Sequence, residues 1–165
     1  MKPVIWLGAI CATALSIAAF AHDEPAAKPS KKAVTVLPAD LKWGPAPPTL
    51  PKGAQLAVLH GDPSRKTYFV MRLKMPDAFR IAPHWHTNDE ELTVMAGTLM
   101  LGVGDKESDA HALEAGSYHY LPGKEHHYAA AKGETVVEVH GFGPFDIHYL
   151  NPADDPSGKP AAAAK

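Results

Sequence analysis

The chain contains very little cysteine: Cys11 is the only one among 165 residues. It lies in an apolar segment near the N-terminus, so the remaining sequence has no thiol. A domain without cysteine forms no disulfide, and it binds metals only through nitrogen and oxygen ligands. The sequence therefore excludes a disulfide framework and a thiolate metal site beyond the first residues.

A strong charge of either sign is also missing. Sixteen Lys and Arg residues stand against eighteen Asp and Glu residues, which gives a formal net charge of −2. No cluster of basic residues forms a stripe that would follow a phosphate backbone. We therefore expect no nucleic acid partner.

Only one apolar run is long enough to concern a membrane, from Val4 to Phe20. Lys2 precedes it, and Ala19-Phe20-Ala21 fits the small-x-small rule for signal cleavage. We expect a signal peptide over residues 1–21, a periplasmic or secreted mature protein, and no stable membrane span after cleavage. An uncleaved anchor is the alternative, because the run is nearly long enough to cross a bilayer.

The rest of the sequence predicts one domain between two polar segments. Residues 22–33 are charged and rich in Pro and Ala, which is typical of a disordered tether. Residues 156–165 resemble them, and we expect a disordered tail there. Residues 34–155 contain no internal repeat and no dividing linker, so we expect a single domain.

Uninterrupted helical stretches are absent as well, because sixteen prolines and thirteen glycines punctuate the chain. The proline-rich segment Leu41–Gly53 predicts an irregular N-terminal arm. Short β-type segments follow it at even spacing, which is typical of an all-β antiparallel sandwich or barrel. The expected strands are Gln55–Leu59, Thr67–Leu73, Phe79–Ala82, Glu90–Ala96, Thr98–Val103, Asp109–Leu113, Ser117–Leu121, His127–Ala131, Thr135–His140 and Ile147–Leu150.

Ten histidines are many for this length, and three of them have a suggestive position. His84 and His86 flank one residue, so in an extended strand they point to the same face, about 7 Å apart along the chain. This is a metal-binding spacing in β proteins. Glu90 opens the next expected strand on the face that carries Leu92 and Val94. His127 follows a Pro-Gly turn, although the adjacent His126 would serve instead if that turn were one residue tighter.

The stretch HWHTNDEELTVMAG resembles the first motif of the cupin superfamily, with His84, His86, Glu90 and Gly97 at the motif positions. The second cupin motif resembles the stretch that begins at Gly116 and ends at His127. Three positions depart from the motifs: Ala78 and Lys124 stand in place of glycines, and Ala131 stands in place of an asparagine. These are turn and framework positions, so the departures concern the turn geometry, and the histidine and glutamate positions of the motifs are all filled.

The resemblance implies an antiparallel jelly-roll barrel with one divalent transition metal, which could be Fe, Mn, Ni, Cu or Zn. The implied ligands are His84, His86, Glu90 and His127. Cupins with this ligand set include dioxygenases, oxidative decarboxylases and isomerases that act on small oxygenated molecules. The resemblance also leaves open that the protein forms a homodimer, because jelly-roll cupins often pair.

From the site we expect a metal-dependent enzyme, of dioxygenase or oxidoreductase type, with a small organic molecule in the barrel. Four protein ligands leave open positions on a five- or six-coordinate ion, and Glu90 could also act as a base. Apolar residues such as Leu92, Val94 and Met100 would make the cavity dry. The alternatives are a non-catalytic module that binds a small ligand or a metal, and a structural barrel that binds nothing.

Other residues give weaker indications. His140 could orient a ligand imidazole, while a structural or surface role is favoured for it and for His119. Arg72 and Lys74 could receive an anionic substrate if their face lined the barrel. Residues 141–145 could form a rim loop over the mouth, with Phe142 or Phe145 as an apolar lid.

Overall fold

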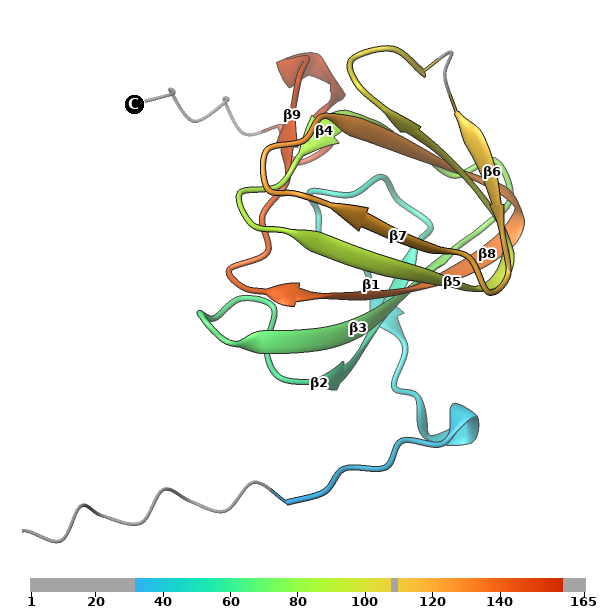
Figure 1. The fold of residues 1–165 in the computed structure, drawn as a ribbon, viewed down its shortest axis with the longest axis vertical. Coiled ribbons are helices and arrows are strands. Elements are labelled where there is room, and N and C mark those ends of the chain that lie inside the picture. The colour runs from blue at the N-terminus through green and yellow to red at the C-terminus, as the bar shows by residue number, and fades with distance from the viewer. Residues whose placement is uncertain (1–31, 108–109, 159–165) are drawn as a thin grey trace, which may run out of the picture. The chain divides into compact units, whose positions relative to one another are not determined.

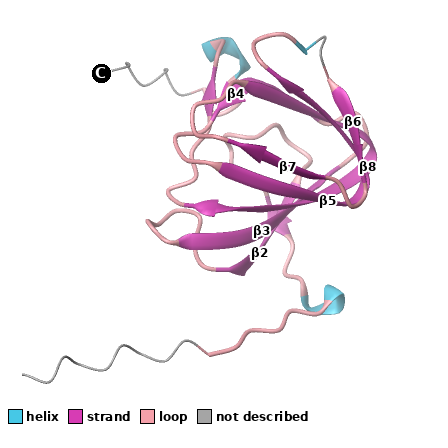
Figure 2. Ribbon diagram, in the orientation of Figure 1, coloured by secondary structure: helices cyan, strands magenta, loops and turns pink. Residues whose placement is uncertain are grey.

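A single antiparallel sheet supplies nearly all regular structure in the computed structural model, which describes residues 32–107 and 110–158 (Figures 1 and 2). Two short 3-10 helices, η1 (Pro38–Asp40) and η3 (Pro152–Asp154), flank it. Among the described residues, no helix is long and apolar enough to span a membrane. The strands are β1 (Gly44–Pro45), β2 (Gln55–His60), β3 (Tyr68–Met75), β4 (Arg80–Trp85), β5 (Glu90–Val103), β6 (His111–Glu114), β7 (Tyr118–Leu121), β8 (His127–Phe142) and β9 (His148–Tyr149).

The sheet curls on itself into the predicted jelly-roll barrel. Along one path the strand order is β1-β2-β3-β8-β4-β9, and β5 pairs with β6, β7 and β8. Every pair is antiparallel. The long strands β5 and β8 run beside each other over most of their length. The expected signal peptide lies outside the described residues.

Two glycine positions bend the sheet where the sequence predicted turns. We expected separate strands on either side of Gly97 and of Lys132-Gly133, but β5 and β8 each pass through as one strand. The register between them shifts around residues 94–98, so the pair is bulged there. Gly97 has φ +76°, and a Cβ on it would lie 2.3 Å from the Glu134 carbonyl oxygen. A glycine therefore lets the two strands bend while they remain paired.

The bulge changes which residues of β5 face the barrel interior. Before it, Leu92 and Val94 are buried, and after it, Leu99 and Leu101 are buried. Because side chains alternate along a strand, one unpaired residue moves the inward set from even to odd numbers. The prediction that Met100 lines the cavity is wrong for this reason, and Leu99 and Leu101 do so instead.

The proline-rich arm packs against the barrel at one end. It is mostly irregular, as predicted, but Gly44–Pro45 pairs with β2. Leu50 of the arm packs on the buried core, and Lys74 lies 4.7 Å above the ring of Trp43. Arg72 forms an ion pair with Glu138, with 2.8 Å between Nε and Oε2. Both cations therefore have partners outside the barrel interior, so neither is available to receive an anionic substrate there.

Candidate metal centre

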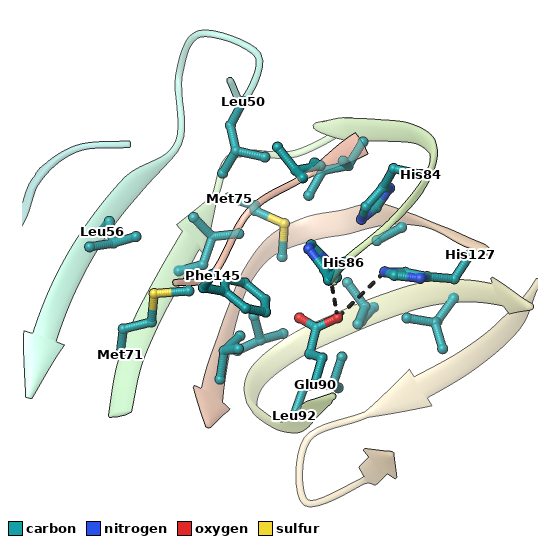
Figure 3. Close-up of a pocket in the computed structure, with 18 residues that line it drawn as sticks. Leu50, Leu56, Met71, Met75, His84, His86, Glu90, Leu92, His127 and Phe145 are labelled. Atoms are coloured by element: carbon teal, nitrogen blue, oxygen red, sulfur yellow. Dashed lines mark ion pairs between the residues drawn. The ribbon is translucent and has the colours of Figure 1, made fainter. Parts of the chain in front are cut away.

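The four side chains of the predicted site come together inside the barrel (Figure 3). His84 is in β4, and His86 follows the end of that strand. Glu90 begins β5 and His127 begins β8, where His127 is the register partner of His84. All four are buried, with exposed fractions between 2% and 8%. The sheet thus brings together residues that are more than forty positions apart in the sequence.

The distances are those of a compact donor cluster. His84, His86 and His127 each offer a ring nitrogen, and these three atoms lie within 4.8 Å of one another. The Nε2 atoms of His86 and His127 are each 3.4 Å from the Oε2 atom of Glu90. Three buried imidazoles this close together could hold a metal ion.

Hydrogen bonds to the main chain orient all three rings. In each of them Nδ1 lies within hydrogen-bond distance of a carbonyl oxygen, which only accepts, so Nδ1 carries the proton. In the neutral ring Nε2 then has a free lone pair, the form in which imidazole binds a metal. The pairs are His84 with Ala82 (2.7 Å), His86 with Asp146 (2.5 Å) and His127 with Glu125 (3.0 Å).

The charges of the site are set by burial and by the mutual contacts. Burial lowers the pKa of His84 well below its usual value, and the neighbouring histidines lower it further. Burial alone would raise the pKa of Glu90, but His86 and His127 outweigh it and hold that pKa well below the usual value. Burial likewise disfavours protonated His86, yet the Glu90 carboxylate raises its pKa overall. Glu90 is therefore ionised and His84 neutral, the protonation states that bind a cation.

The donor set fits a divalent transition metal. Three imidazole nitrogens and one carboxylate oxygen suit iron, manganese, nickel, copper or zinc, and none of the residues that the structure describes is a cysteine that would favour a softer ion. Glu90 is a buried carboxylate, which is costly unless positive charge compensates it, and a bound cation would supply such a charge beside the three rings. The residues present thus match the group that the cupin resemblance implies.

Two of the histidines left uncertain by the sequence, His126 and His140, do not join this cluster. His126 turns to Asp105, with 2.5 Å between Nδ1 and Oδ1, so His127 and not His126 joins the other donors. His140 contacts Glu138 and the hydroxyl of Tyr68, and it touches no ring of the cluster. The structure therefore gives His140 no role in orienting a metal-binding imidazole.

A polar cluster around His86 was not predicted. The Asp146 main-chain oxygen accepts from His86, and its carboxylate accepts from the main-chain N–H and the hydroxyl of Thr87. His148 contacts that carboxylate at 2.9 Å and stacks on Trp85, with ring centroids 4.0 Å apart. The sequence offered no reason to single out either Asp146 or His148, because neither belongs to a motif. The tight spacing of Asp146 and His148, at the start of the last strand, was the only local signal.

Two adjoining cavities lie at the site. The inner one, of about 70 Å³, is lined by the four donors and by core side chains. The outer one, of about 210 Å³, lies beside the arm and is lined on one side by His86 and Asp146. Phe145 borders both and stacks on His86, with centroids 4.4 Å apart. Of the two predicted lid residues, Phe145 lies at the cavity, whereas Phe142 is 63% exposed.

The two motif positions that lack glycine keep the backbone conformation that glycine favours. Among the described residues other than glycine, only Ala78 (φ 59°) and Lys124 (φ 70°) have positive φ. The main-chain N–H of Lys124 donates to the His86 carbonyl at 2.8 Å, so this turn holds the segment that carries a donor. The turn near Lys124 therefore has the left-handed form despite the missing glycine.

Solved structures similar to this chain include an RmlC-like cupin from Shewanella frigidimarina NCIMB 400, with TM-score 0.53 and 11% identity over 66% of this chain and 90% of that one. The chain is similar to a putative acetylacetone dioxygenase from Methylibium petroleiphilum PM1, with TM-score 0.62 and 20% identity over 82% of this chain and 90% of that one. It is also similar to the polyketide cyclase RemF from Streptomyces resistomycificus, with TM-score 0.60 and 17% identity over 76% of this chain and 91% of that one. For an acetylacetone dioxygenase from Acinetobacter johnsonii the TM-score is 0.57, and the identity is 18% over 75% of this chain and 80% of that one. The protein thus has the cupin fold.

Within that fold the chain belongs to one family. Residues 12–148 match the family described as a domain of unknown function, DUF4437. A comparison with curated proteins gives no match. The family is therefore settled, while its description assigns no activity.

Proposed function

We propose that this protein is an exported metal-dependent cupin enzyme, an oxidoreductase of dioxygenase type that acts on a small organic molecule. His84, His86, Glu90 and His127 hold one divalent transition metal. The observation that carries the proposal is the orientation of the three rings. Each is fixed through Nδ1 to a carbonyl, which leaves Nε2 as the donor atom, and Nε2 of His86 and of His127 lies 3.4 Å from the Glu90 carboxylate.

The metal, when bound, supplies Lewis acidity and, for iron or copper, redox chemistry with dioxygen. The protein's own groups determine what surrounds that chemistry. Leu99, Leu101 and Val137 line the inner cavity and exclude water, which strengthens polar interactions inside it. Glu90 either remains a fourth donor or uses Oε2 to accept a proton from a ligand, since it is the carboxylate that lines the inner cavity.

Export is part of the proposal. The segment before His22 has the charge, the apolar run and the small residues of a cleaved signal. A periplasmic or secreted location also accords with a mature chain that has no cysteine. Fractionation of cells that express the full chain, with N-terminal sequencing of the product, tests this part separately.

The experiment that tests the enzyme combines metal analysis with turnover. Protein purified from its own compartment should contain about one transition metal ion per chain by elemental analysis. Oxygen consumption is then followed with protein loaded with each candidate metal. Acetylacetone is the first compound to try, because two structures of the same fold are described as acetylacetone dioxygenases.

The matched variants are His86→Ala and His140→Ala. Loss of a donor from a four-donor site should remove metal binding and activity in His86→Ala. His140→Ala removes a histidine on the outside of the barrel and should keep both. Full metal loading without turnover of any screened compound would favour a binding module instead. Native protein without metal, and unable to take it up, would contradict the metal site itself.

A further inference from the structure

We propose that the outer cavity is the binding site for the uncharged, apolar tail of the substrate, whose oxygen-bearing head lies in the inner cavity. This inference rests on the proposed metal site, because the head needs an ion to bind. It assigns a substrate class: small molecules with one or two oxygen donors at one end and a neutral hydrocarbon or aromatic group at the other.

The first argument is size. The inner cavity of about 70 Å³ is less than half of the roughly 150 Å³ that holds a benzene ring in a protein interior, so it accommodates only a small head. The outer cavity of about 210 Å³ exceeds the roughly 150 Å³ that holds a benzene ring in a protein interior. A substrate larger than its donor head must therefore place its remaining atoms in the outer cavity.

The second argument is that the cavities adjoin. Six residues line both of them, and Phe145 lies between Met71 and His86 at their border (Figure 3). A molecule whose head faces the donors and whose tail enters the outer cavity passes beside this ring. The shared residues are Leu50, Leu56, Met71, His86, Phe145 and Ile147.

The third argument is charge. Within the described part of the chain, neither cavity is lined by a lysine or an arginine. The one acidic residue in the outer cavity is Asp146, whose carboxylate is already bound by Thr87 and His148. An anionic tail would lose its hydration without gaining a partner, and it would face a carboxylate. The cavity therefore selects against charged tails.

Three hydroxamic acids test the proposal on zinc-loaded protein, where binding is measured without any redox reaction. Acetohydroxamic acid provides the head alone, and benzohydroxamic acid adds an apolar ring. 4-Carboxybenzohydroxamic acid adds a charge to that ring. By isothermal titration we expect benzohydroxamic acid to bind at least tenfold more tightly than acetohydroxamic acid, and the carboxylate to abolish this gain.

A charge placed in the outer cavity should reverse the preference. Leu50 is half-buried on the arm and borders both cavities, so Leu50→Lys introduces a cation at the inner end of the outer cavity. We expect the ratio of carboxylated to uncharged ligand affinity to rise at least fivefold. Val58→Lys, on the exposed face of β2, is the matched control and should leave the ratio unchanged.

The outcomes separate this proposal from the one on which it rests. If zinc-loaded protein binds all three acids equally, the tail site is wrong and the metal site stands. If the protein takes up no metal, both fall together. The comparison of the three ligands uses the unaltered protein. It therefore tests the proposal even if Leu50→Lys folds poorly.

Discussion

Asp146 contacts the candidate metal centre with its main chain and its side chain at once. Its main-chain carbonyl accepts a hydrogen bond from the His86 ring. Its carboxylate accepts from the main-chain N–H and the hydroxyl of Thr87, the residue that follows His86. His148 contacts the same carboxylate and stacks on Trp85, the residue that precedes His86 in the sequence. Three consecutive residues are thus held by one short segment. This arrangement makes Asp146 a positioning residue for His86.

Replacing that carboxylate should weaken metal binding without unfolding the protein. Loss of a partner that orients a metal-binding histidine typically reduces affinity by about 10- to 100-fold. Asp146→Ala keeps the main-chain carbonyl that accepts from His86 and loses only the carboxylate that holds Thr87, so we expect a loss at the lower end of this range, about 10-fold, by competition with a chelator. Asp146→Asn should retain more affinity, because its amide oxygen can still accept from Thr87. A cobalt-loaded sample should also show an altered visible spectrum, which a change in general stability would not produce.

Asp77→Ala is the matched control for this prediction. Asp77 also uses its carboxylate to bind a main-chain N–H of another loop, that of Gly133, at 2.7 Å. None of the four donors contacts it, and it lines neither cavity at the site. Asp77→Ala should therefore leave metal affinity and the cobalt spectrum unchanged. Equal losses in both variants would show that Asp146 acts only through stability.

At the scale of residues, the sequence predicted the donors but not what surrounds them. The spacing of His84, His86 and Glu90 places them on adjoining strand ends, so a local pattern was enough. Asp146 and Phe145 reach the site from a loop near the end of the chain. Their roles depend on how that loop packs, and no periodicity reports on it.

At the scale of elements, the turns that lack glycine carry strain. Ala78 and Lys124 have left-handed backbones, which cost an L-residue about 1–2 kcal/mol. Both side chains are exposed, so their removal loses little packing. The hydrogen bond from Lys124 to His86 and that from Ala78 to Ala131 keep the conformation in place. The cupin motif has glycine at both positions, because glycine adopts a positive φ without this strain.

Ala78→Gly and Lys124→Gly should each stabilise the protein. Glycine removes the strain but makes the unfolded chain more flexible, at a cost of about 0.4–1 kcal/mol. The expected net gain is roughly 0.5–1 kcal/mol for each, measured as a shift of the urea midpoint. Ala112→Gly and Lys132→Gly, on strands with ordinary φ, are the controls and should lower stability. A loss in all four variants would contradict the argument.

The sequence predicted where the strands lie better than where they bend. Gly97 and Gly133 looked like turns, because glycine between two β-type segments usually marks a chain reversal. Here each glycine has positive φ within a continuous strand, and pairing between β5 and β8 resumes on both sides. Whether a glycine ends a strand or bends it depends on the partner strand, which the local sequence does not show.

At the scale of the whole molecule, the donors connect strands that are distant in the chain. β4 and β8 pair beside the site, and Glu90 at the start of β5 lies opposite Gly141 of β8. A bound ion would therefore join the end of β4, the start of β5 and the start of β8. Because the unfolded chain does not bring these donors together, metal binding favours the folded state.

Removal of the metal should consequently lower the melting temperature. Metal at one hundred times its dissociation constant stabilises the folded state by about 2.7 kcal/mol, which for a domain of this size corresponds to roughly 10 °C. Calorimetry before and after dialysis against a chelator measures the difference, and added metal should restore it. His86→Ala, which lacks a donor, should melt at the same temperature with and without metal. If the chelator shifts both proteins equally, the ion acts elsewhere on the chain, and the four side chains do not form its site.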